Sequence, residues 1–253
     1  MEPQYSIPLF NAVVNYMYPV VEILIKLGID VNQQDKSGNT VLHNFFLLES
    51  NESIDDKNFD LKYKEKEIIE LEDCMSSERL NKFTIIKLLM DKADLSLKNN
   101  VGATPVNLAL NNNWYFETLY MVHLLGDKFT NSYLLINATT KNWYNLIKKL
   151  LNNKNINPNI QDCHGNTSLH VLLIYSESMN EKKFYEHDPL HPNYYGFTRE
   201  REHIYKCAKL LIDSIDVTIK NKHGDSPLNL STKYKYLLES MDIINKTIKL
   251  IIN

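Results

Sequence analysis

The sequence is poor in cysteine and glycine, and it lacks an excess of either charge. Of its 253 residues, 7 are glycine and 3 are cysteine. Cys74, Cys163 and Cys207 are odd in number and far apart, which excludes a disulfide framework and favours a reducing compartment. The 28 basic residues are balanced by 31 acidic ones, so the strong basic excess of a general nucleic-acid binder is missing. We therefore expect no nucleic-acid partner.

Long apolar runs and common catalytic motifs are missing too. No stretch approaches the roughly 18 uninterrupted apolar residues of a membrane span. Residues 1–6 lack the basic and apolar segments of a secretory signal. Gly-x-x-x-x-Gly-Lys, Gly-x-Ser-x-Gly and His-Glu-x-x-His do not occur. We expect a cytoplasmic protein without catalytic activity, cofactor or metal. Its 43% of hydrophobic residues is ordinary for a globular chain that buries a core.

A short motif recurs four times along the chain. Asp or Asn is followed three residues later by Gly. Thr or Ser stands two residues after this Gly, and an apolar residue followed by His or Asn completes the motif. The copies begin at Asp35, Asn99, Asp162 and Asn221. The first part predicts a turn in which Gly takes a positive φ. The Thr or Ser, followed by Pro in two copies, predicts the start of a helix.

Paired apolar residues occur at helical spacing after or before each turn motif. They are Val20, Val21, Ile23 and Leu24, then Ile85, Ile86, Leu88 and Leu89, then Leu146, Ile147, Leu150 and Leu151, and finally Ala208, Leu210 and Leu211. This spacing predicts a second, buried helix in each copy. Together the motifs resemble the ankyrin repeat. The resemblance implies an all-α ankyrin repeat solenoid, in which helix-turn-helix repeats stack and turn or hairpin fingers line one edge.

Six repeats fit the sequence as a single domain. Their ranges are 1–34, 35–98, 99–130, 131–161, 162–220 and 221–253. The second and fifth are longer than the usual ~33 residues, so we place insertions at about 49–81 and 176–201. The fourth lacks Gly and Pro, but Asn142-Trp143 matches Asn113-Trp114 of the third. Asn tolerates the left-handed conformation that a tight helix-helix turn needs.

The two insertions differ in composition. Residues 49–81 hold 11 acidic and 5 basic side chains, with a plausible helix over 62–73. They are either a solvated extension of the second repeat or an acidic surface for a basic partner. Residues 176–201 are aromatic and contain Pro189, Pro192 and Gly196, which predicts an irregular loop. That loop either binds a partner or packs on the protein itself.

Several His and Cys residues need an interpretation. His187, Asp188 and His191 have the residue types of a metal site, but prolines interrupt them, and a chance surface cluster is favoured. His203 and Cys207 lie one helical turn apart, and we expect a surface histidine and a core cysteine. The resemblance assigns His43 and His170 a structural hydrogen bond between turns; Asn107 and Asn229 replace them in the third and sixth repeats.

The resemblance implies a non-enzymatic module that captures a host or cellular protein through a concave groove and the insertion loops. We expect a monomer whose contact residues lie on the fingertips and in the second insertion. They are Gln34, Lys36, Ser37, Asn100, Val101, Cys163, His164, Lys222, His223, Tyr194, Tyr195, Phe197, Arg199 and Arg201.

The sequence leaves other functions open beside this one. A hydrolase or transferase site built from the insertions is one alternative. An adaptor that recruits a ubiquitin ligase is another, although residues 241–252 match the second helix of the sixth repeat and leave no room for an F-box-like segment. The composition is similar to that of ankyrin effectors that intracellular bacteria deliver into host cytosol. Asn32 resembles the acceptor of an asparaginyl hydroxylase, with an ordinary turn asparagine as the alternative.

Overall fold

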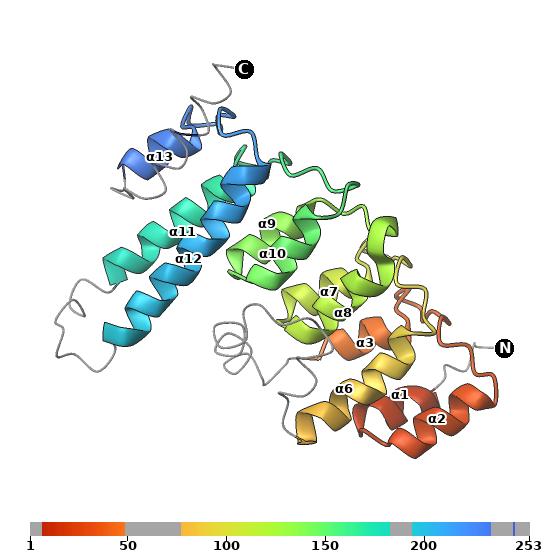
Figure 1. Cartoon of the computed structure of the whole chain (residues 1–253). Coiled ribbons are helices and arrows are strands. Elements are labelled where there is room, and N and C mark those ends of the chain that lie inside the picture. The colour runs from red at the N-terminus through yellow and green to blue at the C-terminus, as the bar shows by residue number, and fades with distance from the viewer. Residues whose placement is uncertain (1–6, 49–76, 183–193, 234–244, 246–253) are drawn as a thin grey trace. The chain divides into compact units, whose positions relative to one another are not determined.

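The computed structural model describes residues 7–48, 77–182, 194–233 and 245, and every regular element in these ranges is a helix (Figure 1). The described helices belong to two compact units, one ending at Gly126 and the other starting at Asp127. The all-helical architecture confirms the predicted fold class. Within the described residues, no helix is both long enough and apolar enough to span a membrane.

The first unit contains three antiparallel helix pairs. They are α1 (Ile7–Val14) with α2 (Tyr18–Lys26), α3 (Val41–Phe46) with α6 (Ser77–Met90), and α7 (Pro105–Asn111) with α8 (Tyr115–Leu125). The first helices α1, α3 and α7 pack side by side, and the second helices α2, α6 and α8 form another row. This is the stacking predicted for helix-turn-helix repeats.

The second unit repeats this arrangement after a short 3-10 turn, η1 (Gly126–Lys128). Its helices are α9 (Tyr133–Thr140), α10 (Tyr144–Leu151), α11 (Ser168–Lys182), α12 (Tyr194–Ser214) and α13 (Pro227–Lys233). Helix α11 packs between α9 and α13, and α12 covers α10 and α11.

The helix boundaries follow from local chemistry. Thr40 caps α3, its hydroxyl accepting from the His43 N–H while the His43 ring accepts from the Thr40 N–H. Thr104 caps α7, and Pro105 is the first residue of this helix, as predicted. Asn113 and Asn142 take φ values of 65° and 57° at the turns between paired helices, which confirms their predicted role.

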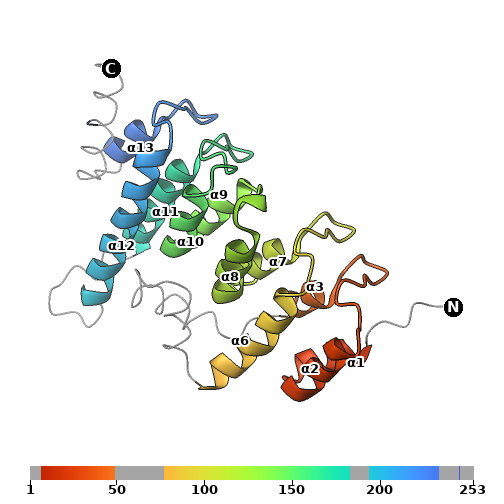
Figure 2. The same cartoon turned by 45° about the vertical axis from the view of Figure 1, so that its right-hand side comes forward.

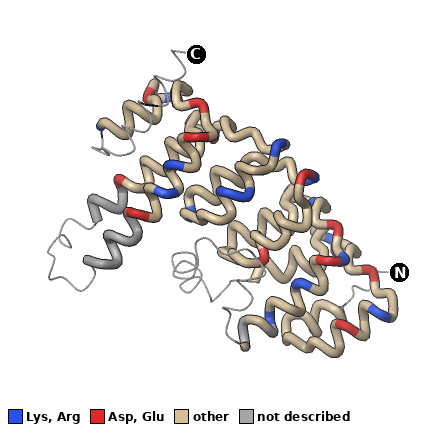
Figure 3. Tube along the Cα trace, in the orientation of Figure 1, with Lys and Arg blue, Asp and Glu red and all other residues tan. Residues whose placement is uncertain are grey.

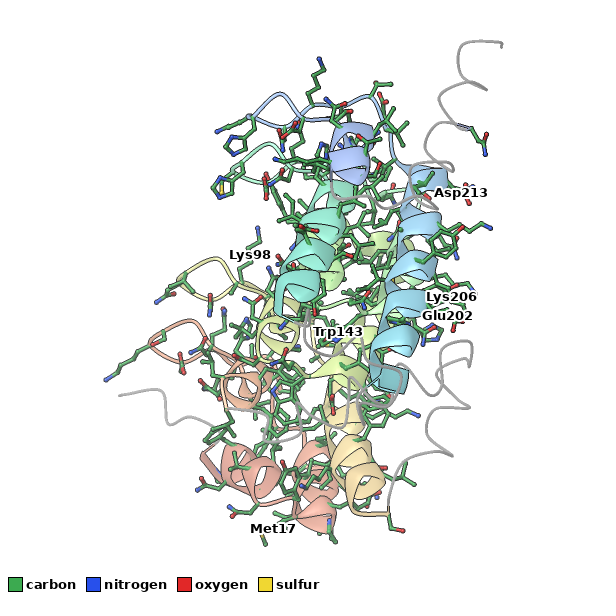
Figure 4. All side chains as sticks on the ribbon, turned by 90° about the vertical axis from the view of Figure 1, so that its left-hand side faces the viewer. Met17, Lys98, Trp143, Glu202, Lys206 and Asp213 are labelled. Atoms are coloured by element: carbon green, nitrogen blue, oxygen red, sulfur yellow. The ribbon has the colours of Figure 1, made fainter. Side chains whose placement is uncertain are left out.

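The core of each unit lies between its two rows of helices. In the first unit Phe45 stacks on Trp114 with 4.8 Å between ring centroids, and both side chains are buried. In the second unit Trp143 and Leu211 are buried in the same way (Figure 4). Most residues of the predicted apolar pairs are buried, but Leu88, Leu151 and Leu210 are half-buried. On α2 only Val21 is buried, and Ile23 is 54% exposed. In the described residues no helix pair covers the outer side of α1 and α2.

Two predictions for the second insertion region are wrong. Residues 176–182 continue α11 and residues 194–201 begin α12, so these parts are helical and not an irregular loop. His203 is not a surface residue: it is 1% exposed, and its Nε2 lies 3.0 Å from the Asn142 carbonyl oxygen. Cys207 is a fully buried core residue, as predicted. The cluster of His187, Asp188 and His191 lies outside the described residues, and so does the helix expected over 62–73.

Candidate interaction surface

Four turns project from the ends of the helices, and we call them fingers. The first unit has a first finger (35–39) and a second finger (99–103), and the second unit has a first finger (162–166) and a second finger (221–225) (Figure 2). In the finger 35–39, the Asp35 carboxylate accepts from the amides of Ser37 at 2.7 Å and Asn39 at 2.9 Å. Gly38 closes the turn with φ 74°, a conformation that favours glycine.

The two fingers of each unit are hydrogen-bonded to each other. The Asn100 amide donates to the Ser37 carbonyl oxygen at 2.9 Å, and the Lys222 amide donates to that of His164 at 2.9 Å. The side-chain amide of Asn99 donates to Asn39 at 3.0 Å. No finger precedes α9: residues 129–132 lead directly into it, and Asn131 accepts from the Tyr133 amide. The fingers therefore form one pair in each unit.

Glutamine and histidine side chains link the two fingers of a pair by hydrogen bonds. Gln34 donates to the Lys98 carbonyl oxygen at 2.9 Å, and Gln161 donates to that of Lys220 at 3.1 Å. His43 Nε2 lies 3.0 Å from the Ala103 carbonyl oxygen, and His170 Nε2 lies 3.0 Å from that of Asp225. The structural bridge implied by the resemblance is thus confirmed for both histidines.

The hydrogen bonds of these histidines define one tautomer. Nδ1 of His43 faces the Thr40 N–H at 3.1 Å and must accept, so Nε2 carries the proton and donates to Ala103. Burial lowers the pKa of His43 and of His170 from 6.5, and the bonds to backbone carbonyls oppose this only in part. Neither ring is placed to act as a base on a bound molecule.

The finger carboxylates are also committed to structure. Burial raises the pKa of Asp35, but hydrogen bonds from Asn44, Asn39 and Ser37 outweigh it, and the net pKa lies below 3.8. Burial also raises the pKa of Asp162, but hydrogen bonds from Asn166 and His164 outweigh this effect, so the pKa of Asp162 is lowered as well. These charges are therefore held against backbone amides at the finger bases. Elsewhere Lys, Arg, Asp and Glu are interspersed in both units (Figure 3).

The predicted fingertip residues are exposed, and the pairing brings them together. Lys36 and Ser37 lie beside Asn100, whose side chain donates to the Lys36 carbonyl oxygen at 2.9 Å. In the second unit His164 lies beside Lys222. Val101 is 85% exposed. Gln34, Cys163 and His223 are exposed as well. The fingertips therefore form two groups of exposed side chains, one in each unit.

Other predicted site residues have different surroundings. Tyr194, Tyr195, Phe197, Arg199 and Arg201 belong to the first part of α12, so they share one helix. Asn32 has a structural contact: its Oδ1 accepts from the Asp94 amide at 2.7 Å. Asn159 accepts from the Asp216 amide at the same distance.

The sequence analysis did not identify the residues that link two fingers by hydrogen bonds. They are Gln161, Asn39, Asn166 and also Gln34, which was expected only as a partner contact. Their signal was the recurrence of Gln immediately before the Asp-x-x-Gly-Asn-Thr motif, at Gln34 and Gln161. The first helices also carry exposed side chains, among them Asn11 and Asn111 in one unit and Ile174, 39% exposed, in the other. In the described ranges, no three His, Cys, Asp or Glu residues are grouped as metal ligands.

Comparison with solved structures supports the fold. The chain is similar to an ankyrin repeat domain from Acinetobacter baumannii, with TM-score 0.62 and 16% identity over 95% of this chain and 97% of that one. It is similar to another protein described as an ankyrin repeat protein, with TM-score 0.56 and 20% identity over 93% and 96%. A third similarity is to a solved complex of a predatory endopeptidase from Bdellovibrio bacteriovorus with an immunity protein, with TM-score 0.50 and 20% identity over 96% and 100%. No family model matches the chain.

Proposed function

We propose that this chain, which has the ankyrin repeat fold, is a non-enzymatic protein-interaction module that binds through its two finger pairs. One observation carries the proposal. The Asp, Gln, Asn and His side chains of the finger bases form hydrogen bonds within each pair, whereas the tip residues are exposed to solvent. A rigid base with exposed tips suits recognition, because little conformational freedom is lost when a partner binds.

In the proposal the exposed faces of the first helices extend this surface, and residues at the beginning of α12 form a separate contact. Tyr and Arg residues are enriched among the side chains that dominate binding energy. This part of α12 holds two tyrosines, one phenylalanine and two arginines, namely Tyr194, Tyr195, Phe197, Arg199 and Arg201. The partner is a host or cellular protein in the cytoplasm, and delivery into host cytosol as an effector is the finer form of the proposal.

The experiment is capture of partners by the full chain, followed by binding measurements with tip variants. Val101→Asp and His164→Asp alter one exposed tip residue in each unit and leave the finger hydrogen bonds intact. Either change should weaken a partner that contacts that tip by about tenfold or more. Lys209→Ala, on the exposed side of α12, is the matched control. A partner bound equally by all three variants would refute the assignment of the surface to the fingers.

Hydroxylation of Asn32 is a separate proposal. Its Oδ1 is engaged by Asp94, and any modifying enzyme must break this bond to reach the side chain. Mass spectrometry of the protein produced in host cells tests the proposal, and an unmodified Asn32 there would dismiss it.

A further inference from the structure

The two units carry the same residues at the same places. One constant spacing separates Gln34, Asp35, Gly38, Thr40 and His43 from Gln161, Asp162, Gly165, Thr167 and His170. A second constant spacing separates Asp94, Lys98, Asn99, Gly102, Pro105 and Asn107 from Asp216, Lys220, Asn221, Gly224, Pro227 and Asn229. The two spacings differ because the insertions between the two sets differ in length.

The packing repeats in the same order. Helices α1, α2, α3, α6 and α7 correspond to α9, α10, α11, α12 and α13. The contacts of α1 with α2 and α3, of α3 with α6 and α7, and of α2 with α6 all have counterparts in the second unit. The described residues therefore contain one module twice, and in the second unit it is described as far as α13, the first helix of its third repeat. The residues kept in both copies build the finger pair, and the exposed tip residues differ.

Each module leaves the outer edge of its second finger uncovered. On the first finger, the carbonyl oxygens of Ser37 and His164 accept from the second finger. The equivalent oxygens on the second finger, those of Val101 and His223, have no hydrogen bond within the described residues.

The glycines of the fingers show the same contrast. A Cβ on Gly38 would meet the Asn100 amide nitrogen at 2.8 Å, and one on Gly165 would meet that of Lys222 at 2.9 Å. At Gly102 and Gly224 a Cβ would meet nothing within 4 Å. There is therefore open space above the second finger where the next backbone lies in the first.

The side chains around this edge differ from those by which the first finger of each pair is hydrogen-bonded to the second. The position of Gln34 on the first finger is occupied by Lys98 on the second, and that of Gln161 is occupied by Lys220. Asn107 and Asn229 occupy the positions of His43 and His170, whose rings bond to a carbonyl oxygen of the next finger. Both lysines are exposed and form no ion pair within the described part of the chain. Figure 4 shows the Lys98 side chain projecting from the base of its finger.

We propose that the outer edge of each second finger binds the main chain of an acidic segment of a protein partner, so that one chain binds two such segments. A backbone N–H of the segment donates to the carbonyl oxygen of Val101 or His223. A carboxylate of the segment pairs with the ammonium group of Lys98 or Lys220. The proposal rests on the proposed interaction function and specifies the ligand of that surface.

The chemistry of the edge supports this occupant. The exposed acceptor is satisfied by a main-chain donor, as it is inside each finger pair. A lysine in place of the clasping glutamine adds a positive charge that favours a carboxylate over a neutral turn. The second fingers differ at three positions, where Asn100, Val101 and Ala103 of the first unit correspond to Lys222, His223 and Asp225 of the second. Because the carboxylate of Asp225 is balanced by the ammonium group of Lys222 on the same finger, the two edges should bind an acidic segment with similar affinity.

The test is an NMR titration of the isotopically labelled full chain at low salt with the capped peptide acetyl-Gly-Asp-Glu-Asp-Gly-amide. We expect saturable shift changes at the amides of Gly102 and Ala103 and, over the same range of peptide concentration, of Gly224 and Asp225. The matching Asn/Gln peptide should bind about fivefold more weakly, the size of an exposed ion-pair effect. Lys98→Gln should weaken the first site alone and Lys220→Gln the second alone. Lys92→Gln, at an exposed lysine that follows α6 in the first unit, is the matched control.

Three results would overturn the proposal. One is the absence of shifts at both edges, and another is a set of shifts that both lysine variants leave unchanged. The third is line broadening at these edges that depends on protein concentration without peptide, which would identify a second copy of the chain as the occupant. If the peptide does not bind but captured partners respond to Val101→Asp or His164→Asp, this site fails and the general interaction function stands.

Discussion

The contact between paired fingers makes a sharp prediction about two glycines of the first unit. Gly38 and Gly102 have φ values of 74° and 78°, so alanine at either position is held in the left-handed region. That strain costs about 1–2 kcal/mol. The gain from a less flexible unfolded chain is the same at both positions and cancels in the comparison.

The two positions differ only in what lies above them. A Cβ on Gly38 would lie 2.6 Å from Asn100 Oδ1, 2.8 Å from Asn100 N and 3.1 Å from Asn99 Cα, whereas Gly102 faces open space. Two of these three atoms are backbone, so the second finger must move. Overpacking of this kind costs a further ~1–3 kcal/mol. We therefore expect a loss of about 2–5 kcal/mol for Gly38→Ala and about 1–2 kcal/mol for Gly102→Ala.

Urea unfolding of both variants measures this difference, and amide exchange locates it. The extra loss in Gly38→Ala should appear as faster exchange at Asn100, whose amide donates to Ser37. Gly165→Ala and Gly224→Ala repeat the comparison in the second unit. Equal losses for Gly38→Ala and Gly102→Ala would refute the finger contact.

Three further predictions concern single groups. Because burial lowers the pKa of His43 and His170 in the folded state, their contribution to stability should be complete above about pH 6.5 and lost as pH falls through the folded-state pKa, as denaturant titrations against pH will measure. His43→Asn should remove the bond to Ala103 and cost about 1–2 kcal/mol at pH 8, with a smaller loss at pH 5, where the wild-type histidine is already weakened. Asn113→Val should cost about 1–2 kcal/mol more than Asn113→Gly in thermal unfolding, since a β-branched residue resists its φ of 65°; equal stabilities would contradict the assigned conformation.

The local features of the fold could be predicted from the sequence because each depends on a few neighbouring residues. Asp35 and Gly38 shape one turn, Thr40 caps one helix, and Asn113 forms the turn between the two helices of one pair. The weak fourth repeat could be aligned because Asn142 keeps the turn conformation even without a finger before α9.

Features that depend on distant residues were missed. His203 is buried because its helix packs on α10, and its partner is the carbonyl of Asn142, far away in the sequence. Gly196 did not prevent a helix, since one glycine costs only about 1 kcal/mol and packing of α12 on α11 compensates. The separation of the fingers into two pairs depends on which turns meet in space, and a list of motifs does not contain this information.

The most direct test of the account is a footprint of a captured partner on the full chain by amide exchange. The account predicts increased protection in the finger segments 34–37 and 99–103, or 161–164 and 221–225, with little change in the second helices α8 and α10. Protection confined to α8 and α10, with the fingers unchanged, would contradict the claim that paired fingers are the recognition surface of this protein.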